Sequence, residues 1–218
     1  MYTGPAAGVA VPSRSGGGIR AKTAAGGSVT IGLPGGGDVA GTKAGKGTTV
    51  YPGAAPSTDL AVQATPGGGV RALAVLEDKS APRQQRYLIG LPTGAGLVKT
   101  STGMVAAVGP DGQVLGAFAT PWAKDANGKS VPTSYQVEGN TLVQSVQTTG
   151  ATAFPVVADP WYDPSSWENW DTIKCVASQS QDGAIYAGAG AALAGPEAIG
   201  PGAVGGALAG TFVGLKNC

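Results

Sequence analysis

The chain has 218 residues and a net charge of +1, with 12% charged residues, 38 glycines and 16 prolines. This balance gives no electrostatic reason to expect a nucleic-acid partner. The sequence contains no histidine, which excludes Ser-His-Asp and Cys-His catalysis and the common zinc sites. We therefore expect a non-enzymatic protein with no catalytic residues, no metal and no other cofactor, and the sequence identifies no small-molecule substrate.

Residues 1–26 are rich in Gly, Ala, Ser and Pro and have few large apolar side chains. Such a segment cannot bury enough surface to offset the entropy lost on ordering. The composition predicts a disordered N-terminal arm over residues 1–26.

Residues 27–160 alternate short β-type runs with turn residues. The runs are Ser28–Ile31, Asp59–Ala64, Val70–Glu77, Arg86–Leu91, Met104–Val108, Gln113–Phe118, Tyr135–Val137 and Leu142–Gln147. Gly109-Pro110-Asp111-Gly112 and Glu138-Gly139-Asn140-Thr141 supply turns between neighbouring runs. The pattern predicts an antiparallel β module, a sandwich or curled sheet, with residues 27–56 poorly ordered because large core residues are few.

Residues 161–218 begin like a helix and become rich in Gly and Ala. Ser165 can cap a helix, and Glu168 stands three residues later, as in a capping box. Trp167, Trp170 and Ile173 then recur at helical spacing. The expected fold class is α+β, a mostly antiparallel β domain followed by a C-terminal Gly/Ala-rich helical hairpin.

Two ridges of small residues recur every four positions in this segment. They are Gly183, Ala187, Ala191 and Gly195, then Gly202, Gly206, Gly210 and Gly214. Such ridges, a glycine zipper, let two helix backbones approach closely, and the Gly- and Pro-containing stretch 195–201 separates them. Cys175 and Cys218 bracket the hairpin, so we predict a disulfide between them.

The hairpin is apolar, since Glu197 is its only charge between Ala184 and Leu215. One interpretation is a membrane-active, bacteriocin-like hairpin. Its two apolar pieces would extend roughly 18 and 21 Å, short of a hydrocarbon core of about 30 Å. The other interpretations are a self-packed hairpin that docks on the β domain, and simple low complexity. The partner is therefore membrane lipid or the chain itself, through the glycine ridge.

An aromatic cluster marks the junction between the two parts. It consists of Trp161, Tyr162, Trp167 and Trp170. These side chains could form an interfacial belt, a sugar-stacking platform or the seam between two domains.

Acidic residues near this junction are better explained by local structure than by chemistry. Asp159 and Asp163 each precede a proline, so turn roles account for them better than the paired carboxylates of glycoside hydrolysis. Asp125-Ala126-Asn127-Gly128 begins like a calcium loop but lacks the other ligands and the closing glutamate.

Four pieces of the chain carry a resemblance to a known group of proteins. They are Leu76-Glu77-Asp78-Lys79-Ser80-Ala81-Pro82, the stretch from Pro121-Trp122-Ala123-Lys124-Asp125 to Thr133, Gly139-Asn140-Thr141-Leu142-Val143-Gln144, and Phe154-Pro155-Val156-Val157-Ala158-Asp159-Pro160-Trp161. Through them the stretch Val70–Trp161 resembles a β-rich module of mostly uncharacterised actinobacterial secreted proteins. The resemblance implies export and a variable C-terminal segment, in some members Gly/Ala-rich with bracketing cysteines. It implies no catalytic residues.

These observations predict a secreted or cell-surface protein, although Met1-Tyr2-Thr3-Gly4-Pro5 does not have the basic and apolar regions of a signal peptide. The expected function is that of an exported bacteriocin-like or toxin-like protein whose C-terminal hairpin interacts with membranes. The alternative is a structural or adhesive cell-envelope protein with a self-packing hairpin.

Overall fold

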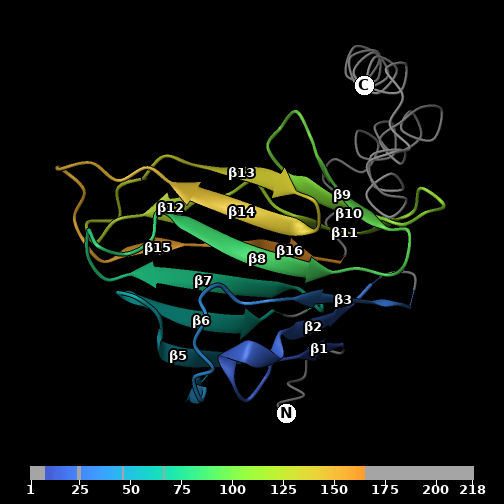
Figure 1. Ribbon diagram of the computed structural model, residues 1–218, viewed down its shortest axis with the longest axis horizontal. Coiled ribbons are helices and arrows are strands. Elements are labelled where there is room, and N and C mark those ends of the chain that lie inside the picture. Colours follow the sequence, from blue (N-terminus) through green and yellow to red (C-terminus); the bar gives the residue numbers. More distant parts are fainter. Residues whose placement is uncertain (1–7, 24–25, 46, 66, 165–218) are drawn as a thin grey trace, which may run out of the picture.

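The computed structural model describes residues 8–23, 26–45, 47–65 and 67–164, which form two antiparallel β-sheets around a shared core (Figure 1). The expected antiparallel β architecture is confirmed. The expected C-terminal helical hairpin lies outside the described residues. Within the described part of the chain, the only helical element is the short 3-10 helix η1 (Ser15–Gly17), and no helix is long and apolar enough to cross a bilayer.

The first sheet has six strands in the order β1-β2-β3-β8-β14-β13. Their bounds are β1 (Val9–Ala10), β2 (Ile19–Lys22), β3 (Ser28–Ile31), β8 (Gln84–Gly90), β14 (Thr141–Val146) and β13 (Thr133–Glu138). The sheet thus combines the N-terminal strands with strands from residues 84–146, through pairing of β3 with β8.

The second sheet has the order β4-β5-β6-β7-β16-β11-β10-β9, with β12 and β15 attached beside β7. Their bounds are β4 (Thr42–Gly45), β5 (Thr48–Ala55), β6 (Thr58–Ala64), β7 (Val70–Leu76), β9 (Gly96–Lys99), β10 (Val105–Val108), β11 (Val114–Phe118), β12 (Ala123–Lys124), β15 (Val156–Ala158) and β16 (Trp161–Asp163). One edge of β7 pairs with β6, and its other edge is shared by β15 and β16.

The largest side chains of the core between the sheets are aromatic. Tyr51, Tyr87, Tyr135 and Tyr162 are all fully buried, as is Phe118. Each tyrosyl hydroxyl donates to a backbone carbonyl, those of Pro12, Ala72, Asp159 and Leu115 respectively. A tyrosine can therefore fill this core without leaving its hydroxyl unpaired, which would be costly in a buried site.

The expected strands and turns of the module are confirmed to within a few residues. In the first turn, Gly112 adopts φ +77° and donates its N–H to the Gly109 carbonyl at 3.0 Å. In the second, Gly139 adopts φ +57° between the paired residues Glu138 and Thr141. A glycine accepts these left-handed conformations without the strain that a side chain would add.

The prediction of a disordered arm over residues 1–26 is wrong for residues 8–23. This stretch forms β1, η1 and β2, and Val9, Val11, Ile19 and Ala21 are buried in the main core. Four apolar side chains spaced along a short segment suffice because β2 pairs with β3 and adds them to an existing sheet. Overall composition does not reveal this pairing.

Two further boundaries differ from the sequence-based prediction. Residues 27–56, expected to be poorly ordered, contribute β3, β4 and β5, including the fully buried Tyr51. The β module does not end at residue 160, because β16 (Trp161–Asp163) pairs with both β7 and β11. The ordered module therefore extends from β1 to β16.

Candidate functional site

Most of the functional residues predicted from the sequence lie outside the described residues. These are Cys175 and Cys218, the ridge residues Gly183, Ala187, Ala191, Gly195, Gly202, Gly206, Gly210 and Gly214, and the two tryptophans Trp167 and Trp170. The structure places Trp161 and Tyr162 of the aromatic cluster, both on β16.

Trp161 and Tyr162 point to opposite faces of the sheet, as successive strand residues must. Tyr162 faces the core, where its hydroxyl donates to the Leu115 carbonyl at 2.9 Å and its ring lies 5.3 Å from that of Phe118. Burial raises the pKa of Tyr162. The ring also occupies the space above Gly116, where an added Cβ would lie 2.5 Å from Tyr162 Cζ.

Trp161 lies on the outer face of the sheet. The Arg71 guanidinium sits 5.2 Å from the centroid of its ring, a cation–π distance. Its indole Nε1 is buried without a hydrogen-bond partner among the described residues. The structure thus separates the two described members of the expected cluster and pairs Trp161 with an arginine that is its register partner on β7.

Asp159 is the most deeply buried acidic residue among the described residues, with 1% of its surface exposed. Its Oδ1 accepts the backbone N–H of Trp122 at 3.1 Å, and its own N–H donates to the Trp122 carbonyl at 3.3 Å. Burial raises the pKa of Asp159 to about 6, while the bonds to Trp122 and the charge of Arg71 act in the opposite direction. The sequence indicated a turn role for this carboxyl before Pro160 and did not predict its burial.

Several segments that are distant in sequence are linked to one another near Asp159. β12, which follows Trp122, pairs with β15, which precedes Asp159, and Gln144 Nε2 donates to the Trp122 carbonyl at 3.3 Å. β15 in turn pairs with the end of β7 at Leu76. β12, β14, β15 and the end of β7 are therefore connected to one another by strand pairing and by the Gln144 hydrogen bond.

Asp125, at the start of the calcium-loop-like stretch, accepts backbone hydrogen bonds from its own turn and from Ala153. Oδ1 accepts the N–H groups of Asn127 at 3.0 Å and Lys129 at 2.9 Å, and Oδ2 accepts that of Ala153 at 3.4 Å. Among the described residues, no group of three acidic or cysteine side chains is arranged to hold a metal ion.

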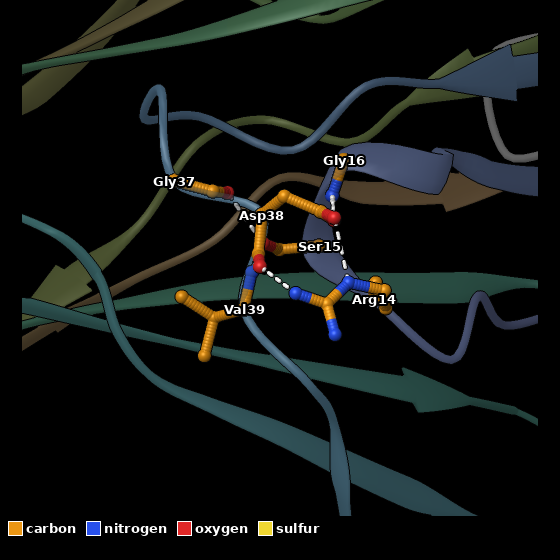
Figure 2. Close-up of polar contacts among 6 residues, drawn as sticks. All are labelled: Arg14, Ser15, Gly16, Gly37, Asp38 and Val39. Carbon is orange, nitrogen blue, oxygen red and sulfur yellow. Dashed lines mark hydrogen bonds and ion pairs between the residues drawn. The ribbon is translucent and has the colours of Figure 1, made fainter.

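A surface cluster that the sequence did not indicate joins η1 to the loop before β4 (Figure 2). Arg14 Nε lies 2.6 Å from Asp38 Oδ2, and Arg14 Nη2 donates to the Asp38 carbonyl. The hydrogen bond from Arg14 lowers the pKa of Asp38. Beneath this pair, the buried Ser15 donates to the Gly37 carbonyl at 2.7 Å and accepts the Val39 N–H at 2.9 Å.

A shallow, open groove runs beside this cluster. It is lined by Pro12, Ser13, Arg14, Gly16, Gly17 and Asp38. The contacts of Arg14 and Ser15 with residues 37–39 form a clasp between η1 and the loop before β4.

No protein-family model, curated protein or solved structure matches this chain.

Proposed function

We propose that this is an exported, non-enzymatic protein of bacteriocin-like or toxin-like type, in which the β module carries a membrane-interacting C-terminal segment, residues 165–218. The observation that supports this proposal best is the position of β16. This strand is not at an edge of its sheet but lies between β7 and β11, with Tyr162 in the core. The chain beyond Asp163 is thus attached to the interior of a stable sheet, as expected for a carrier.

The non-enzymatic part of the proposal is supported by how the buried polar side chains are used. Asp125 and Asp159 accept backbone N–H groups, and Gln85, Gln144 and Thr58 donate to backbone carbonyls. Hydrogen bonds of this kind satisfy groups that burial would otherwise penalise. Backbone hydrogen bonds of this kind are typical of buried polar side chains with a structural role.

The membrane part is supported by the sequence of the segment itself. Between Ala184 and Leu215 it has a single charge, Glu197, and four glycines at every fourth position from Gly202 to Gly214. Small-residue ridges of this kind mediate helix packing in membranes.

Dye release from vesicles of phosphatidylcholine and phosphatidylglycerol tests the proposal on the full chain. We expect release by the wild type and a rate about tenfold lower for Gly206→Leu, because a side chain on the ridge prevents close packing at a cost of about 1–3 kcal/mol. Ala203→Leu, off the ridge, is the matched control and should release dye like the wild type. No release by the wild type at any protein concentration would contradict the proposal.

The alternative, a structural or adhesive envelope protein, is favoured by a different observation. The outer face of β9, β10 and β11 carries a buried apolar cluster that is separate from the main core, which suits a C-terminal segment that packs on the module. Absence of dye release together with stable packing of residues 165–218 would support this alternative.

A further inference from the structure

The outer face of the ten-stranded sheet carries a second apolar cluster, separate from the main core. Its buried members are Met104, Ala106, Val108, Val114 and Ala117, with Val98 packed against them. The pairing register places them on one face: Val98 is opposite Ala106, and Ala106 is opposite Ala117. Their neighbours Val105 and Phe118 face the other way, into the main core.

This outer cluster is more deeply buried than the rest of the same face. Ala106 and Ala117 are 1% exposed and Val108 is 2% exposed. On β7, the outward residues Leu73 and Val75 are only half-buried. All described members of the outer cluster come from one layer of the module, namely β9, β10, β11 and the residue before β10.

The chain beyond the described residues starts next to this cluster. Asp163, the last residue of β16, is the register partner of Ala117, so it lies on the same row as Val98 and Ala106. Residues 165–218 follow directly, and their long stretch from Ala184 to Leu215 has one charge. Apolar side chains of such a segment gain free energy by leaving water for an apolar surface.

We propose that residues 165–218 dock on the outer face of β9, β10 and β11, over the cluster formed by Val98, Met104, Ala106, Val108, Val114 and Ala117. The docked segment covers the apolar outer cluster, and the cluster shields the segment from water. This inference concerns where the segment lies on the module and does not depend on whether it later enters a membrane.

Photo-crosslinking of the full chain tests the docking. Benzoylphenylalanine replaces Val98, which is half-buried at the rim of the cluster, and in a matched control it replaces Val75, half-buried on the same face of β7. Irradiation at position 98 should give intramolecular cross-links to peptides of residues 165–218, about tenfold more than at position 75, because cross-linking requires direct contact. Cross-links between two chains, or none to this segment, would overturn the docking.

A second variant covers the case in which the photoreactive residue disturbs the sheet. Ala106→Glu places a charge under the docked segment, and Val75→Glu is its control on the same face. Trypsin cleavage after Lys174 should become about tenfold faster in Ala106→Glu than in Val75→Glu, since opening of a docked segment governs its proteolysis. Equal cleavage rates in the two variants and the wild type would count against the docking.

The two proposals fail separately. Cross-links from position 98 without dye release would retain the docking and reject the membrane function. Dye release without cross-links would retain the membrane function and reject the docking.

Discussion

Trp122 and Asp159 are joined by a reciprocal pair of hydrogen bonds across 37 residues of chain. The Trp122 N–H donates to Asp159 Oδ1 at 3.1 Å, and the Asp159 N–H donates to the Trp122 carbonyl at 3.3 Å. The connection lies next to the buried Tyr135, whose hydroxyl donates to the Asp159 carbonyl at 3.5 Å. A carboxylate in this position can accept hydrogen bonds, but its charge is poorly solvated.

The burial of Asp159 makes the stability of the module depend on pH. Its pKa is raised to about 6 in the folded chain, so the folded state binds the proton more tightly than the unfolded state, whose pKa is about 3.9. The stabilisation that comes from tighter proton binding by Asp159 in the folded state is fully present below pH 4. It is lost as the pH rises through 6. Asp159→Asn keeps an acceptor for the Trp122 N–H and removes the charge. We expect it to raise the free energy of unfolding at pH 8 by about 1–3 kcal/mol.

Urea denaturation at pH 4 and pH 8 measures this effect. At pH 4 the variant and the wild type should differ little, because Asp159 is then protonated and uncharged. Asp111→Asn, in an exposed turn, is the control and should show the same small change at both pH values. A variant less stable than the wild type at pH 8 would show that the charged carboxylate is itself stabilising.

The N-terminal strands should be essential for stability. Ile19 on β2 is completely buried, whereas its neighbour Arg20 is exposed. Ile19→Ala should lower the free energy of unfolding by about 2–5 kcal/mol through lost burial and the cavity left behind. Arg20→Ala, on the same strand, should change it by less than about 0.5 kcal/mol. Thermal denaturation compares the two, and a chain from which residues 1–26 are deleted should be less stable than either.

The hairpins of the module could be predicted from the sequence because the residues that form each hairpin and its turn are close together in the chain. The run Met104–Val108, the run Gln113–Phe118 and the Gly109–Gly112 turn lie within fifteen residues of one another. Each half of such a hairpin carries apolar residues, and Gly112 supplies the left-handed conformation that the turn requires. These features can be read without knowing the rest of the fold.

The missed strands depend on distant partners. β1 and β2 contain only two and four residues, and they join a sheet in which β3 pairs with β8, more than fifty residues away. β16 contains only three residues, and its place between β7 and β11 follows from the whole sheet. The Asp159–Trp122 connection and the Ser15 contacts likewise join residues distant in sequence, so no local pattern indicates them.

Gly116 is required by the position of Tyr162. It adopts φ +150°, and a Cβ at this residue would lie 2.5 Å from Tyr162 Cζ. Gly116→Ala should therefore force the buried ring aside and lower the free energy of unfolding by about 1–3 kcal/mol. Gly96→Ala on β9, where a Cβ meets nothing within 4 Å, is the matched control and should be tolerated. Chemical denaturation measures both, and equal stability of the two variants would show that the Tyr162 ring moves freely.

The clasp in Figure 2 should owe more to the buried Ser15 than to the exposed ion pair above it. Ser15→Ala removes the donor to the Gly37 carbonyl and the acceptor of the Val39 N–H. Leaving such groups unpaired should cost about 1–3 kcal/mol.

Asp38→Asn removes the charge that faces Arg14. Both side chains of this pair are more than half exposed, so solvent screens their attraction. Asp38→Asn should therefore have the smaller effect on thermal stability, and 0.5 M salt should reduce the effect further. A larger loss in Asp38→Asn than in Ser15→Ala would assign the clasp to the ion pair instead.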